Sequence, residues 1–169
     1  MTSHATPSQS PTVTSRELYS AVYGTVLASA LLAALQRDGD QYTPYYDAVW
    51  VLVTATTAAL AHGYANHMAT HRKETAGHRW QGLLRHLWDE WPLVAAAVPT
   101  VVLLLASGAF DWPEEPSTLA GLGVDAAMLF GLGVLAARRS GYGRGGAVLV
   151  GAADLALGVL IAGANAVIK

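Results

Sequence analysis

The sequence predicts an all-α polytopic membrane protein, a bundle of five transmembrane helices. Three observations support this fold class. Only 13% of the 169 residues are charged, whereas soluble domains carry about 25%, so there is too little charge to coat a soluble surface of this size. Hydrophobic residues make up 53% of the chain, and the mean hydropathy is +0.34. The apolar residues also gather in long blocks without helical or strand periodicity, which is typical of membrane-spanning segments.

The apolar blocks place the five spans at about 18–35, 46–69, 92–106, 119–137 and 147–168. At ~1.5 Å per residue the first block is about 27 Å long, close to a hydrocarbon core of about 30 Å. A cleaved signal peptide is the rival interpretation of this block, because small residues lie near its end. The preceding residues 1–15 are rich in Ser, Thr and Pro and predict a disordered cytoplasmic tail. Residues 16–169 then form a single transmembrane domain.

A basic stretch, HRKETAGHRWQGLLRHLWDEW, separates the second span from the third. Its large apolar residues are spaced to share roughly one helical face, namely Trp80, Leu83, Leu84, Leu87 and Trp91. This pattern predicts a short amphipathic helix that lies in the membrane interface. Gly and Ala are frequent in the last two spans, including Gly131 and Gly158. Small residues let helix backbones approach closely in lipid, which favours a packing role for them.

The basic residues predict an orientation with the amino terminus in the cytoplasm and the carboxyl terminus outside. With five spans placed in this way, eight of the ten Lys and Arg residues lie on the inner side: Arg16, Arg72, Lys73, Arg79, Arg85, Arg138, Arg139 and Arg144. Arg37 and Lys169 lie outside. Cytoplasmic loops of membrane proteins carry an excess of Lys and Arg, so the distribution favours this topology.

Ionisable side chains inside the spans are candidate functional groups, because they are costly in lipid. His62, Glu17 and Glu90 fall in the inner half or at the inner interface, and we expect them to be the metal-ligating candidates. Imidazole and carboxylate groups suit a divalent transition metal such as Zn, Fe, Mn or Ni. The alternative for His62 is a simple hydrogen bond between helices.

A second set of polar residues contains candidates for proton transfer or for a polar network. It comprises Asp154, Asp125, Tyr64, Asn66 and His67. Asp125 and Asp154 are single carboxylates in apolar helices, and both hydrogen bonding to a neighbour and proton relay are open for them. His67 lies near the inner interface, where solvation is the simpler interpretation.

Several function classes have no support in the sequence. There is no Cys, and hence no thiol nucleophile or thiolate metal site. The net charge of -2 gives no reason to expect nucleic acid as a partner. The glycine-rich segment 141–146 follows no strand and is interpreted as a turn. No nucleophile elbow or other reaction motif predicts an enzyme.

Two short motifs carry a family resemblance. They are AHGYA at residues 61–65 and EWP at residues 90–92. The layout of residues 16–168 resembles an uncharacterised family of small bacterial multi-pass integral membrane proteins, which implies a bacterial inner-membrane location and no particular activity. A more distant topological similarity is to the vacuolar-iron-transporter-like proteins, which are dimeric metal/proton exchangers. Tyr23-Gly24 is followed here by Thr25-Val26-Leu27 without a carboxylate, and the Glu-rich cytoplasmic segment is replaced by a basic one. No site residue of that family is carried over.

Three functional hypotheses follow from these residues. The first is a small transporter-like protein for a cation or proton, with an inner-leaflet cluster of histidine and carboxylate groups. The alternative is a noncatalytic membrane scaffold or partner subunit. A further alternative is a membrane-embedded enzyme that acts on a lipidic substrate. The expected partners are the lipid bilayer and further copies of the chain, and a divalent transition metal is the cofactor to test.

Overall fold

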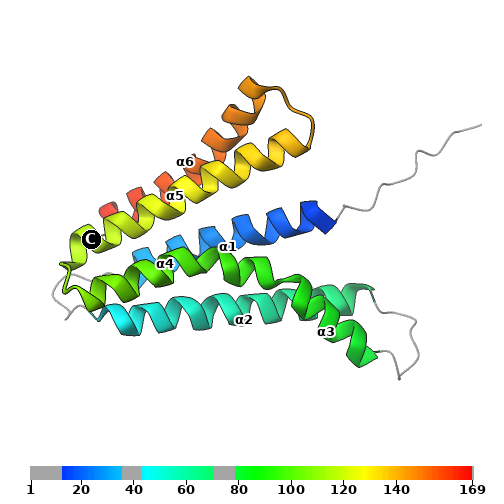
Figure 1. Ribbon diagram of the computed structural model, residues 1–169, viewed down its shortest axis with the longest axis horizontal. Helices are drawn as coiled ribbons and strands as arrows, with labels where there is room; N and C mark the ends of the chain where they lie inside the picture. Colours follow the sequence, from blue (N-terminus) through cyan, green and yellow to red (C-terminus); the bar gives the residue numbers. More distant parts are fainter. Residues whose placement is uncertain (1–12, 36–42, 71–78, 169) are drawn as a thin grey trace, which may run out of the picture.

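The computed structural model describes residues 13–35, 43–70 and 79–168, which contain six helices and no strand. The helices are α1 (Val13–Leu35), α2 (Pro44–Thr70), α3 (Arg79–Asp89), α4 (Trp91–Ala109), α5 (Glu114–Arg139) and α6 (Arg144–Ile168). Figure 1 shows the five long helices running roughly side by side, with α3 set at an angle near the end of α2. The all-helical fold class is therefore confirmed.

Five helices are long and apolar enough to cross a membrane, as in a multi-pass membrane protein. The most hydrophobic stretch of each has a mean hydropathy between 1.3 and 2.1. The last three residues of the expected disordered tail, 13–15, are part of α1, and residues 1–12 lie outside the described residues. The basic segment 71–78 also lies outside them. The helix α3 occupies the place predicted for the short helix between the second and third spans.

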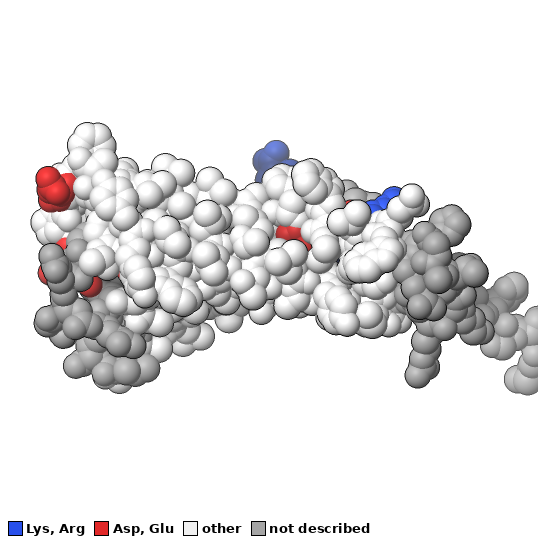
Figure 2. Space-filling view, turned by 90° about the horizontal axis from the view of Figure 1, so that it is seen from below, with Lys and Arg blue, Asp and Glu red and all other residues white. Residues whose placement is uncertain are grey.

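The outer surface of the bundle is apolar, as contact with lipid requires. Large side chains such as Leu149, Leu160 and Val102 are 72%, 67% and 57% exposed. On the face drawn in Figure 2, a band without Lys, Arg, Asp or Glu separates acidic residues at one end from charged residues nearer the other. A soluble monomer rarely exposes a continuous apolar surface of this extent.

Helix α1 lies between α4 and α5 and packs against both (Figure 1). Its contact with α4 is close, because a Cβ added to Gly24 would lie 2.3 Å from the Leu93 carbonyl oxygen. Leu32 of α1 and Leu104 of α4 are among the fully buried side chains. The helices α5 and α6 form a hairpin that diverges from α1 at the end where α1 begins (Figure 1).

Helices α4 and α5 end in the same kind of turn. The amide of Trp112 bonds to the Ser107 carbonyl, and the amide of Tyr142 bonds to the Ala137 carbonyl. These six-residue bonds are the Schellman closure of a helix, which needs a left-handed residue just before the last amide. Gly141 fills that position after α5 with φ +85°, whereas after α4 it is Asp111 with φ +51°. The two helices therefore stop by backbone geometry, and the chain can reverse direction at once.

Candidate functional site

Glu90 is a buried carboxylate at the break between α3 and α4. Pro92 causes this break, because proline lacks an amide hydrogen and its ring clashes with the carbonyl four residues earlier. Glu90 is only 1% exposed. Its Oε2 accepts a hydrogen bond of 2.6 Å from the Ser20 hydroxyl of α1, and its Oε1 accepts one of 2.9 Å from the Asn66 amide of α2. Glu90 therefore links α1 and α2 to the break between α3 and α4.

Asp125 of α5 is a second buried carboxylate, deeper in the bundle and fully shielded. Its Oδ1 accepts a hydrogen bond of 2.5 Å from the Thr100 hydroxyl of α4. Its Oδ2 accepts one of 3.0 Å from the Ser29 hydroxyl of α1. Like Glu90, this carboxylate is bonded to two other helices.

The two carboxylates bond to α1 on opposite sides of that helix. Their serine donors, Ser20 and Ser29, are nine positions apart, which is about 13 Å along the helix axis and about 180° around it. Thr25 lies between these serines in the sequence, is fully buried, and donates its hydroxyl hydrogen to the Ala21 carbonyl. We name this set of buried groups the α1 polar groups and define it by Ser20, Thr25, Ser29 and the two carboxylates.

The α1 polar groups include two carboxyl groups that have no cation of the described residues beside them. Within the described ranges, no Lys, Arg or His side chain pairs with Glu90 or Asp125. Hydroxyl and amide donors stabilise an ionised carboxylate, and the same hydroxyls can accept a hydrogen bond when the carboxyl is protonated. Each site can therefore accommodate either protonation state without losing its partners.

His62 of α2 lies apart from the carboxylates. Its ring is 6.1 Å from the Tyr19 ring and 5.9 Å from the Tyr23 ring, measured between centroids. Glu17 lines a surface cavity near the start of α1. The three metal candidates, His62, Glu17 and Glu90, thus have different neighbours. The part of the chain that the structure describes contains no group of three His, Asp or Glu side chains able to hold a metal ion. The metal-binding role stays a prediction.

The polar-network candidates also differ in their surroundings. Asn66 bonds directly to Glu90, which is one of the α1 polar groups. The His67 ring is buried and packs edge to face on the His86 ring, with centroids 5.6 Å apart. Tyr64 is 53% exposed. Asp154 of α6 lies against Gly133 of α5, where an added Cβ would collide with its carboxylate.

Sequence reasoning missed the hydroxyl donors Ser20, Ser29 and Thr100. A serine within an apolar span is common and inexpensive, since it can bond back to its own helix. The available signal was indirect: Ser20 and Ser29 lie inside the first span, and burying a carboxylate such as Asp125 requires donors from somewhere.

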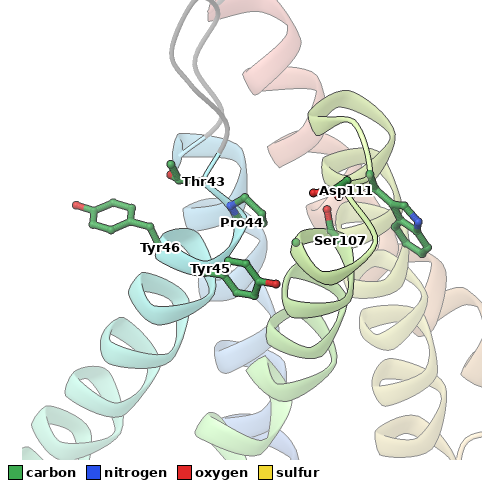
Figure 3. A pocket seen from close by; sticks show the side chains of 8 residues that line it. Thr43, Pro44, Tyr45, Tyr46, Ser107 and Asp111 are labelled. Carbon is green, nitrogen blue, oxygen red and sulfur yellow. The ribbon is translucent and has the colours of Figure 1, made fainter.

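A cavity of about 560 Å³ lies at the opposite end from Glu90, between the start of α2 and the end of α4. Its lining includes Tyr45, Ser107 and Asp111. Figure 3 shows Tyr45 directed toward α4, whereas Tyr46 points away from it. The Ser107 hydroxyl is 2.8 Å from the Ser117 hydroxyl of α5, so this lining residue also contacts α5.

No protein-family model, curated protein or solved structure matches this chain. The family resemblance drawn from the AHGYA and EWP motifs therefore stays a prediction, and the functional argument depends on the geometry of the chain.

Proposed function

We propose that this chain is a transporter-like integral membrane protein that moves protons, alone or coupled to a cation, by way of the α1 polar groups. One observation carries the proposal: Glu90, at the break between α3 and α4, and Asp125, within α5, are both buried without a cation beside them in the described part of the chain. Ionisable groups at membrane depth are expensive and are typical of proton relays and ion pathways. Function is the simplest reason for two such groups to be buried against the same helix.

The chemistry assigned to each residue follows from its partners. Asp125 and Glu90 are the proton carriers. Ser29 and Thr100 donate to Asp125 in its ionised form, and they can rotate to stay bonded when it takes up a proton. Thr25 lies between the two serines along α1, but its side chain is rotated by about 140° from Ser20 around the helix. The two carboxylates are therefore separated by the width of α1 as well as by the serine spacing of about 13 Å, so water must carry the proton between them.

We further propose a bacterial inner-membrane location with the amino terminus inside. Among the described residues, the helix ends at one end of the bundle in Figure 1 carry Arg16, Arg138, Arg139 and Arg144, and α3 at the same end carries Arg85. The acidic residues Asp111, Glu114 and Glu115 belong to the other end. The excess of basic residues on cytoplasmic loops supports the assignment. In this placement α3, whose Trp80 and Trp88 are 73% and 77% exposed, lies at the inner interface.

Flux measurements on proteoliposomes test the proton function. A potassium diffusion potential is applied, and an internal pH-sensitive dye reports proton entry. We expect wild-type protein to acidify the lumen faster than empty liposomes. Asp125→Asn, which keeps the shape but cannot ionise, should reduce the rate to that of empty liposomes, and Glu90→Gln should slow it. Ser107→Ala is the matched control, since this buried hydroxyl of α4 contacts Ser117 and neither carboxylate.

A wild-type rate equal to that of empty liposomes would sink the proposal, provided that the reconstituted protein keeps the melting temperature it has in detergent. The proposal also fails if Asp125→Asn conducts like wild type.

A second candidate function, a membrane scaffold that assembles with its own copies, is favoured by a separate observation. Gly123, Ala127 and Gly131 are exposed on one face of α5 at four-residue spacing. A Cβ added to Gly123 or Gly131 would meet nothing within 4 Å. Small residues at this spacing let a second helix approach closely in lipid.

The sequence predicts the same packing role for Gly131 and Gly158. The structure separates them, because a Cβ on Gly158 would contact Leu129 and Ala126 of the same chain. Gly131→Leu should therefore reduce self-association in cross-linking, while Ala153→Leu on the exposed face of α6 should not. Equal cross-linking in both variants argues against this face. The hypothesis of an enzyme acting on a lipidic substrate gains no support from the geometry, since His62 meets two tyrosines instead of the carboxylates.

A further inference from the structure

A second cavity of about 560 Å³ lies between the start of α1 and the end of α3, at the end of the bundle proposed to face the cytoplasm. Its lining combines cations, carboxylates and aromatic rings: Arg16, Glu17, Arg85, His86, Trp88, Asp89 and Trp91. The cavity therefore holds two guanidinium groups and two carboxylates, and their formal charges cancel.

Within the described residues, these four charged side chains, of Arg16, Glu17, Arg85 and Asp89, do not pair with one another. Arg16, Glu17 and Arg85 are exposed, and Asp89 is partly buried. A cavity with opposite charges held apart is complementary to a ligand that also carries both charges.

The aromatic residues indicate where such a ligand would reside. Trp88 is 77% exposed and Trp91 is 56% exposed. Tryptophan is enriched at the level of lipid headgroups, where its ring contacts the acyl boundary and its N–H contacts water. Its face also attracts an ammonium group by a cation–π interaction. The cavity thus combines interfacial rings with polar groups at the same end of the bundle.

We propose that this cavity binds the zwitterionic headgroup of a phospholipid, a phosphate ester with an ammonium group two carbons away. Arg16 and Arg85 bind the phosphate, because guanidinium groups match phosphate oxygens in charge and geometry. Glu17, Asp89 and the tryptophan rings bind the ammonium. A purely anionic headgroup would meet the two carboxylates at close range, so the site discriminates against it. The assignment goes beyond the proposed proton function, which uses Glu90 and Asp125.

Native mass spectrometry of the full chain in detergent tests the assignment. The probes are short-chain phosphatidylethanolamine, phosphatidylglycerol of the same chain length, and soluble O-phosphoethanolamine. We expect wild-type protein to retain phosphatidylethanolamine more strongly than phosphatidylglycerol. Arg85→Gln should weaken binding of both lipids by about tenfold or more, as loss of a charge-assisted hydrogen bond predicts. Asp89→Asn should weaken only phosphatidylethanolamine and so remove the preference.

Arg138→Gln is the matched control, because Arg138 is also exposed, belongs to the same end of the bundle and is absent from the cavity lining. Each variant must keep the wild-type melting temperature, and Arg16→Gln replaces Arg85→Gln if that variant unfolds. Equal retention of both lipids by wild type overturns the proposal, as does an Arg85→Gln variant that behaves like Arg138→Gln. Binding of O-phosphoethanolamine as tight as that of the lipid supports the headgroup chemistry and identifies a soluble phosphoammonium compound as its source.

Discussion

Thr100 of α4 donates a hydrogen bond of 2.5 Å to Asp125 of α5, and both side chains are completely shielded from solvent. Thr100→Val keeps the size of the side chain but leaves one carboxylate oxygen without this donor. Hydrogen bonds between membrane helices are worth about 0.6 kcal/mol on average and up to about 1.7 kcal/mol. We expect a loss near the upper value, because the acceptor is a buried carboxylate.

Thermal or denaturant unfolding in detergent measures this loss. Thr100→Ser retains the hydroxyl and should recover most of the stability. Thr56→Val is the matched control, since the Thr56 hydroxyl is exposed and bonds only to the Leu52 carbonyl of its own helix. If Thr100→Val and Thr56→Val unfold alike, the bond to Asp125 contributes nothing to stability.

The close approach of α1 to α4 predicts that Gly24→Ala destabilises the bundle. The new Cβ would lie 2.3 Å from the Leu93 carbonyl oxygen, so a backbone has to move. Overpacking of this kind costs about 1–3 kcal/mol. The comparison is Gly123→Ala, where the Cβ meets nothing within 4 Å and helix propensity favours alanine. Melting temperatures of the two variants should therefore shift in opposite directions, and a shared direction would contradict the packing of α1 on α4.

The left-handed turn at the end of α4 predicts that Asp111→Gly stabilises the protein. Asp111 has φ +51°, a conformation that costs a side-chain-bearing residue about 1 kcal/mol and glycine almost nothing. The gain should appear as a higher melting temperature. Gly141→Ala makes the reverse change at φ +85° after α5 and should lower it by a similar amount. An unchanged Asp111→Gly variant would mean that the aspartate side chain offsets the cost of its own backbone.

We expect that any change in melting temperature caused by added metal does not depend on His62. The rings nearest His62 are those of Tyr19 and Tyr23, and the described residues hold no cluster of three His, Asp or Glu ligands. A metal that binds only the folded state raises the melting temperature. Scans with Mn, Fe, Co, Ni and Zn should therefore give the same shift in wild type and His62→Ala. A selective rise lost in His62→Ala would support the metal site predicted from the sequence.

The helices could be predicted because burial in lipid needs long apolar blocks, and these are visible in the sequence. The hydrogen-bond partners of the polar groups could not be predicted from the sequence. Sorting Glu17, His62 and Glu90 by depth gives their height along the membrane normal but not the direction in which each side chain points. In the structure Glu90 meets Ser20 and Asn66, while His62 meets two tyrosines.

The two glycines chosen for a packing seam illustrate the same limit. Gly131 and Gly158 occur in similar Gly- and Ala-rich segments, so composition treats them as equivalent. The rotation of α5 is set by its buried face, which contains Asp125, Leu129 and Gly133. Gly131 is consequently directed away from the bundle, whereas Gly158 of α6 packs against α5.

The hydrogen bonds of α1 also constrain how the chain is made. The hydrogen-bond acceptor of Ser20 is Glu90, 70 residues later in the chain, and that of Ser29 is Asp125, 96 residues later. During synthesis α1 therefore enters the bilayer well before α4 and α5, which complete its contacts. Asp125 in turn can be buried without loss only if α1 is still close by when α5 arrives. The contacts of the first helix are thus complete only after α5 has been made, and a chain interrupted before α5 would leave Ser29 without its acceptor.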